Sequence, residues 1–135
     1  MDISKYLSDN GRVLKFPDNF NQPLVIDGIR CIPDSVQQLS FGHYFNQPLA
    51  IDGIHCIPDS VQQLEFGYYF NQPINEYDLP PSITKIIFRN KPNENTVLPY
   101  SIKEVIINNI PYYPNTPEFD KLFTIYHPPI KSAIQ

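Results

Sequence analysis

The stretch Phe20-Asn21-Gln22-Pro23-Leu24 decides the fold, because it returns twice along the chain. It recurs as Phe45-Asn46-Gln47-Pro48-Leu49 and as Phe70-Asn71-Gln72-Pro73-Ile74, a step of 25 residues each time. The segment 26–39 between the first two copies returns as 51–64 with a single replacement, in which His55 stands for Arg30. A fixed step of this size predicts a repeat architecture, in which each copy is one unit that stacks on the next.

A second motif follows each copy and carries the periodicity further toward the C-terminus. It is a serine followed by apolar residues one, four and six positions later, of which the last two alternate with an outward residue, and its serines are Ser35, Ser60, Ser82 and Ser101. The step between these serines shortens from 25 to 22 and then to 19 residues. We therefore expect four full turns with ragged ends.

The alternation of inward and outward residues in this motif predicts short β-strands. The expected strands are 14–16, 39–41, 64–66, 86–88 and 105–107. The 15 prolines of the chain argue against long helices. The predicted fold class is a β-rich single-stack solenoid with one parallel sheet of five or six short strands and little helix.

The repeated residues have structural roles in such a stack. We expect Phe20, Phe45 and Phe70 to form part of the core. We expect Asn21, Asn46 and Asn71 to point inward, where an amide satisfies backbone groups left unpaired at a bend. Asp27-Gly28 and Asp52-Gly53 predict tight turns.

These motifs resemble the FNIP repeats, which occur in amoebae and in the giant DNA viruses that infect them. The resemblance covers residues 13–110 and implies a leucine-rich-repeat-like solenoid, in an intracellular protein of viral or amoebal origin. Many members of that family carry an N-terminal F-box that recruits a ubiquitin ligase. Residues 1–12 are too short for an F-box, so a substrate-recognition role would need a separate ligase component.

The domain organisation follows from where the period holds. We expect an N-terminal cap at 1–12 with a short helix within residues 2–10, and repeats at 13–110. A C-terminal cap should follow at 111–126 with a short helix at 116–123, because terminal turns of solenoids need a polar cover. The remaining residues, 127–135, should form a mobile tail.

Composition excludes several classes of function. The net charge of −4 comes without a basic stripe, so we expect no nucleic-acid partner. The sequence contains no apolar run long enough to span a membrane, and its N-terminus lacks the pattern of a secretory signal. We therefore expect an intracellular location. The recurring serines belong to every turn and so are structural, and no glycine-rich phosphate loop is present. The chain is therefore not expected to be an enzyme or to bind a cofactor.

The cysteines and histidines do not predict a metal site. His43, His55 and His127 lack the spacing of metal ligands. Cys31 and Cys56 occupy the same position of successive turns, close enough for a disulfide. A ladder of two reduced thiols is the favoured interpretation in an intracellular protein.

The outward face of the sheet is the expected binding surface, since solenoids bind partners across such faces. One outward column should hold Gln38, Gln63, Lys85, Glu104 and, at its end, Lys121. The other should hold Lys15, Ser40, Glu65, Ile87, Ile106 and, at its end, Phe123. The second column turns apolar in the C-terminal half of the chain.

Exposed Ile87 and Ile106 would form a patch that monomers seldom leave bare. A protein partner could cover it, or the same patch of a second copy in a homodimer, or the C-terminal segment through Tyr112, Tyr113, Phe119 or Ile130. The favoured function is a non-catalytic protein–protein interaction scaffold whose partner the sequence does not name. The alternatives are a self-assembling structural protein, such as a homo-oligomer or virion component, and the substrate-recognition subunit described above.

Overall fold

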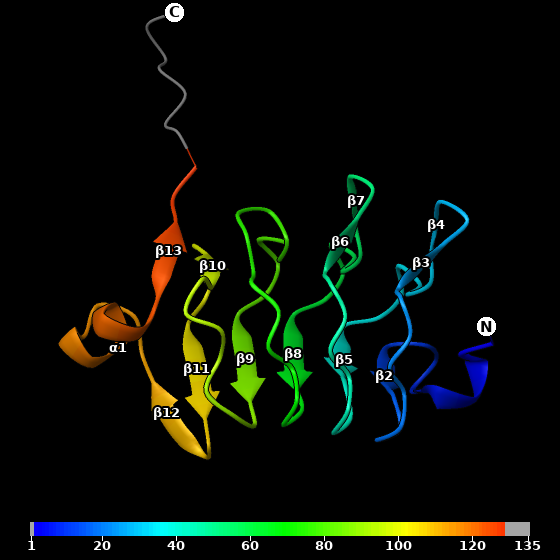
Figure 1. The fold of residues 1–135 in the computed structure, drawn as a ribbon, viewed down its shortest axis with the longest axis horizontal. Helices are drawn as coiled ribbons and strands as arrows, with labels where there is room; N and C mark the ends of the chain where they lie inside the picture. The colour runs from blue at the N-terminus through cyan, green and yellow to red at the C-terminus, as the bar shows by residue number, and fades with distance from the viewer. Residues whose placement is uncertain (1, 129–135) are drawn as a thin grey trace, which may run out of the picture.

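Stacked parallel strands form one wall of the molecule, in the order that the repeat predicts (Figure 1). The computed structural model describes residues 2–128. The sheet of this wall contains five parallel strands: β2 (Val13–Lys15), β5 (Gln38–Ser40), β8 (Gln63–Phe66), β9 (Lys85–Phe88) and β11 (Glu104–Ile107). Equivalent residues of successive turns face one another, since Leu14 pairs with Leu39 and Leu39 with Leu64. The solenoid prediction is confirmed, with strands that begin one residue earlier than expected.

An antiparallel strand closes each end of this sheet. At the N-terminal end a 3-10 turn (Ser4–Tyr6) leads into β1 (Leu7–Ser8), which pairs with β2. The N-terminal segment is therefore only partly helical. At the other end β12 (Ile110–Tyr112) pairs with β11.

The C-terminal end of the stack carries the short helix that the sequence predicts. The helix α1 (Pro117–Leu122) begins after Thr116, whose hydroxyl accepts a hydrogen bond from the backbone N–H of Phe119 at 3.3 Å. Residues 129–135 of the expected mobile tail lie outside the described residues.

The opposite side of the stack, uppermost in Figure 1, changes along the chain. The first two turns carry hairpins, β3 (Val25–Ile26) with β4 (Ile29–Arg30) and β6 (Ala50–Ile51) with β7 (Ile54–His55). Asp27 and Gly28 have φ of 53° and 75°, so the expected tight turn is confirmed. Further on, β10 (Val97–Pro99) pairs in parallel with β13 (Thr124–Tyr126) instead. The hairpins account for the longer step of the first turns.

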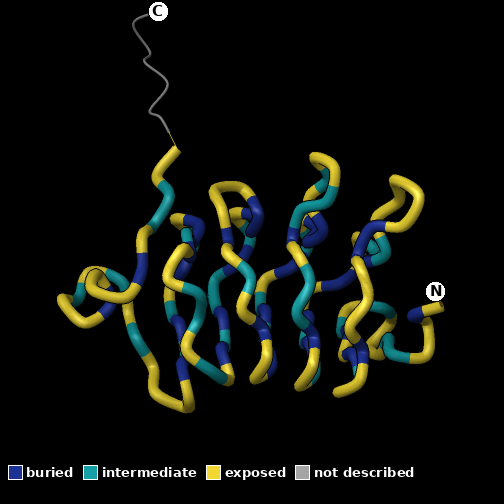
Figure 2. The backbone as a smooth tube through the Cα atoms, in the orientation of Figure 1, coloured by how far each residue is buried: buried dark blue, intermediate teal, exposed yellow. Residues whose placement is uncertain are grey.

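Stacked phenylalanine rings form much of the core between the two sides. Buried stretches of backbone recur in the successive turns of the stack (Figure 2). Phe16, Phe41, Phe66 and Phe88 make one column with ring centroids 5.4–5.7 Å apart. The phenylalanines of the repeated motif make a second column at 6.0 and 6.1 Å and are buried, as expected. Each turn thus buries its rings against the next turn, and a single turn would have no core.

The expectation that the repeated asparagines point inward is wrong. Asn21 and Asn71 are exposed and Asn46 is half-buried. The Oδ1 atom of Asn21 accepts a hydrogen bond from the backbone N–H of Asn46, and that of Asn46 accepts one from Asn71, both at 2.9 Å. The amides run along the stack and join one turn to the next. They satisfy backbone groups as expected, but at the surface, because the phenylalanine rings fill the interior.

Candidate binding surface

The outer side of the sheet presents two rows of side chains across successive turns. Register places Gln38, Gln63, Lys85 and Glu104 side by side in the first row. It places Lys15, Ser40, Glu65, Ile87 and Ile106 in the second row. These neighbours are the ones that the sequence predicts for the outward face, whereas their role in binding is a proposal.

The expected ends of the two rows are wrong. Lys121 lies on α1 and Phe123 is buried against Phe119, with ring centroids 5.1 Å apart. The reason is that the chain reverses after β11 and adds β12 as an antiparallel strand. Pro111 therefore lies opposite Ile106, and the hydroxyl of Tyr113 donates to Glu104 Oε2 at 3.2 Å.

Charged side chains of neighbouring turns pair on this face of the sheet. Arg89 donates through Nη2 and Nε to Glu65 Oε2, at 2.8 and 3.0 Å. The Nζ atom of Lys85 lies 3.7 Å from Glu104 Oε1. Pairs as exposed as these contribute at most about 1 kcal/mol to stability, so their main effect is on the shape and charge of the surface.

Ile87 and Ile106 are half-buried rather than exposed, so the bare apolar patch expected there is not present. Ile87 and Ile106 are neighbours on adjacent strands. Pro111 of β12 lies on the other side of Ile106, and Glu65 of β8 lies on the other side of Ile87. Of the residues expected to cover them, Phe119 is buried in the core and Tyr112 packs against that core. Tyr113 reaches the sheet face and bonds to Glu104. Ile130 lies outside the described residues.

The sequence analysis missed a cluster of aromatic side chains beside the sheet. His43, Tyr44, Tyr68 and Tyr69 lie where the second and third turns leave the sheet. His43 stacks on Tyr68 at 5.6 Å and Tyr44 on Tyr69 at 5.3 Å, each with an interplanar angle of 11°. The three tyrosines are about half exposed, at 53%, 48% and 50% in chain order. We call these four residues the aromatic cluster.

Two glycines bring the turns close enough for these rings to stack. A Cβ atom on Gly67 would lie 2.1 Å from the carbonyl oxygen of Gly42, and one on Gly42 would lie 2.5 Å from that of Pro17. The sequence did contain a signal for the aromatic cluster. A glycine followed by two aromatic residues directly precedes two copies of the repeated motif, as Gly42-His43-Tyr44 and as Gly67-Tyr68-Tyr69.

A groove of about 380 Å³ runs between the sheet and the aromatic cluster. Lys15, Ser40, Glu65 and Arg89 line its sheet side, and Asp18, His43 and Tyr68 line its other side. A second hollow of about 270 Å³ shares the same four sheet residues and extends over Gln38 and Gln63. We call the two together the sheet-face groove. It centres on Ser40 and Glu65, nearer the N-terminal end than Ile106.

The serine and cysteine side chains, which could act as nucleophiles, have surroundings typical of structural residues. The hydroxyls of Ser35, Ser82 and Ser101 donate to carbonyl oxygens of the preceding turn, Ser82 to Val61 O at 2.7 Å and Ser101 to Ile83 O at 2.6 Å. The hydroxyl of Ser60 is buried without a hydrogen-bond partner among the described residues. Both cysteines are free, as the favoured interpretation predicts, and burial raises the pKa of Cys56 to about 11.

Residues 2–128 contain no group of three or more His, Cys, Asp or Glu that could hold a metal ion. Among the helices described there, none has the length and apolarity needed to cross a membrane.

Comparison with known proteins yields one family. The model of the FNIP Repeat family matches residues 28–69, 53–91 and 70–109, which together span more than half of the chain. No curated protein and no solved structure matches the chain significantly. The stacked turns and the repeated motif agree with this match, and the chain belongs to the FNIP repeat family.

Proposed function

We propose that this protein is a non-catalytic interaction scaffold that binds a protein partner in the sheet-face groove. The aromatic cluster is the observation that carries the proposal. Tyrosines are enriched at the energetic centres of protein interfaces, because a large rigid ring also carries a hydrogen-bonding hydroxyl. Tyr44, Tyr68 and Tyr69 are held in place by stacking and still expose half of their surface.

The distribution of variation along the stack supports the same role. The buried positions repeat from turn to turn, as Leu39, Leu64 and Ile86 do. The outward positions differ, since Ser40, Glu65 and Ile87 occupy equivalent places. A scaffold with a regular core and a varied surface offers shape and charge complementarity to one partner without needing a cofactor.

The charges along the groove indicate what the partner would present. Lys15 and Arg89 line it together with Asp18 and Glu65, so both signs alternate within a short distance. A protein surface with mixed charges and an apolar or aromatic anchor fits this lining better than a uniformly charged polymer does. We place this interaction inside the cell, as the sequence analysis expects.

Quantitative affinity capture from the cell that makes the protein tests the proposal. The groove variants are Tyr68→Ala and Ser40→Arg, and the control is Leu122→Ala, an exposed leucine on α1 that lines neither hollow of the sheet-face groove. We expect a captured protein that is lost with both groove variants and kept with the control. Loss with the control alone, or with none of the three, contradicts binding in the sheet-face groove.

Self-assembly is the second candidate, and one exposed surface favours it. Ile29 and Ile26 of the first hairpin are 71% and 41% exposed, whereas the equivalent Ile54 and Ile51 are half-buried. A second copy could cover the first hairpin. Sedimentation velocity separates the two functions: a stable oligomer that Ile29→Asp converts to monomer supports assembly, and a monomer at all concentrations opposes it.

A further inference from the structure

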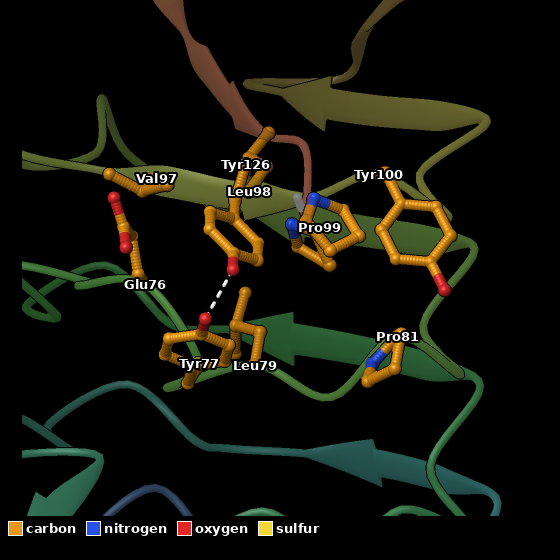
Figure 3. Close-up of a pocket in the computed structure, with 10 residues that line it drawn as sticks. Glu76, Tyr77, Leu79, Pro81, Val97, Leu98, Pro99, Tyr100 and Tyr126 are labelled. Carbon is orange, nitrogen blue, oxygen red and sulfur yellow. Dashed lines mark hydrogen bonds between the residues drawn. The ribbon is translucent and has the colours of Figure 1, made fainter. Parts of the chain in front are cut away.

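A second hollow lies on the side of the stack that carries the hairpins, away from the sheet-face groove. It has a volume of about 200 Å³ and opens between the third turn and the strands β10 and β13 (Figure 3). Leu79 and Leu98, both buried, contribute to its lining. We call it the tyrosine–proline pocket, after Tyr77, Tyr100, Tyr126, Pro81 and Pro99, which also line it.

Two of its tyrosines are joined across 49 positions of the sequence. The hydroxyls of Tyr77 and Tyr126 are hydrogen-bonded, and their ring centroids lie 4.8 Å apart in an edge-to-face arrangement. Tyr77 has φ of 69°, a conformation that a bulky side chain rarely adopts. Asp78 closes the same loop by accepting the backbone N–H of Asn75 at 2.8 Å. The surrounding contacts thus hold Tyr77 in place with 60% of its surface exposed.

The pocket offers few kinds of polar group to a ligand. Its surface is nearly all apolar, and tyrosine hydroxyls are its main hydrogen-bonding side chains. A ligand with many N–H groups would find few acceptors on this surface, since only the tyrosine hydroxyls and Glu76 supply them among the lining side chains. A ligand of flat apolar rings and carbonyl oxygens would suit it, since a hydroxyl can donate to a carbonyl.

Proline-rich peptide has this chemistry. Proline lacks a backbone N–H, its ring packs on aromatic faces, and a run of prolines is already extended in the polyproline II helix. Aromatic-lined grooves are a recurring way to bind such peptides. Among the described residues, Glu76 is the one charged side chain that lines the pocket, so it favours a basic residue beside the prolines.

The pocket also continues in a way that suits an extended ligand. An adjoining hollow of about 320 Å³ shares Tyr77, Leu79 and Pro81 with it and reaches His55 of the second hairpin. Together they form a groove on both sides of Tyr77. We propose that this groove binds a proline-rich segment of a partner protein in the polyproline II conformation, with the prolines against Tyr77 and Tyr100 and a flanking basic residue near Glu76.

Fluorescence anisotropy with a labelled synthetic peptide tests this proposal. The probe is an arginine followed by a run of about ten prolines, long enough to form several turns of polyproline II. The control peptide has the same length, with serine and glycine in place of the prolines. The protein variants are Tyr100→Ala and Tyr77→Gly, in which glycine keeps the left-handed backbone. Tyr113→Ala, an exposed tyrosine outside both hollows, is the matched control variant, and thermal melts verify that every variant folds.

We expect saturable binding of the proline peptide, weakened about tenfold or more by Tyr100→Ala and by Tyr77→Gly and unchanged by Tyr113→Ala. Equal binding of the two peptides, equal loss with Tyr113→Ala, or no binding overturns the proposal. A chain ending at Pro128 adds one more comparison. If only that shortened chain binds the probe, segment 129–135 of the protein itself is the occupant, and the partner proposal is wrong. The sheet-face groove is not involved in this result, so either proposal can fail without the other.

Discussion

At the scale of the residue, Asn46 joins three turns of the stack. Its backbone N–H donates to Asn21, and its Oδ1 atom accepts from the backbone N–H of Asn71 and from Nε2 of Gln72, the latter at 3.2 Å. Asn93 continues the ladder, since its Nδ2 donates to the carbonyl oxygen of Asn71 at 3.0 Å. The amide is suited to this place because it offers a donor and an acceptor at once.

Replacement of Asn46 by alanine tests the ladder. The variant leaves the N–H of Asn71 without its acceptor, and because water reaches this surface we expect a loss of about 1 kcal/mol in the free energy of unfolding. Urea denaturation measures it. Asn19→Ala is the control, an exposed asparagine outside the ladder, with an expected change within about 0.5 kcal/mol. Equal effects of the two substitutions would contradict the role given to Asn46.

The two cysteines should differ in reactivity. Burial raises the pKa of both thiols, that of Cys56 to about 11, and Cys56 is buried whereas Cys31 is half-buried. A raised pKa means less thiolate at any pH below it, so both reactions should accelerate as the pH rises. With a thiol-specific disulfide reagent at pH 8 we expect a faster phase, abolished by Cys31→Ser, and a slower one from Cys56. A single rate for both thiols, or none free in the native protein, would contradict this assignment.

At the scale of the element, the spacing between turns is set where the backbones touch. Gly67→Ala would place a Cβ atom against the carbonyl oxygen of Gly42, and neither backbone can move without parting the two turns. We expect a loss of at least about 2 kcal/mol in the free energy of unfolding. Urea denaturation and the near-ultraviolet signal of the stacked tyrosines would report it.

Gly53→Ala is the control for this substitution. Gly53 has φ of 79° at the tip of the second hairpin, and a Cβ atom there meets nothing within 4 Å. The strain of the left-handed conformation should cost about 1 kcal/mol without moving the turns apart. If Gly67→Ala destabilises the protein no more than Gly53→Ala does, close approach of the turns does not limit the stack.

The central strands could be predicted from the sequence, but the reversal at the end of the sheet was missed. Each strand of the repeats has apolar residues at fixed offsets, and identical offsets in successive turns impose the register. The reversal into β12 depends instead on Asn108 and Asn109, with φ of 49° and 67°. Asparagine tolerates this conformation, so the pair was a readable signal for a tight turn.

For the candidate site, the sequence predicts which side chains are neighbours across the strands, but it does not predict how exposed these side chains are. The neighbours of Ser40 and Glu65 follow from the repeat alone. The burial of Ile106 depends on Pro111, which comes from a strand outside the repeat. The aromatic cluster depends on the two glycines that bring the turns together, a contact between backbones that no pattern of apolar residues reveals.

At the scale of the whole molecule, the stack has two sides with different chemistry. The sheet side carries charged and polar residues beside the aromatic cluster, and the hairpin side carries the tyrosine–proline pocket. Each surface is built from several turns, so neither exists in an isolated repeat. Under the two proposals, the stack would bind two protein segments on its opposite sides.

Site-specific photo-crosslinking tests the central claim, that a partner binds in the sheet-face groove, most directly. A photoreactive amino acid replaces Ser40 in the groove or, as the control, Ile29 at the exposed tip of the first hairpin. After irradiation in the cell that makes the protein, we predict a covalent adduct with another protein from position 40 and none from position 29. Adducts from position 29 alone, or a self-adduct of twice the mass of the chain from position 40, would contradict the claim.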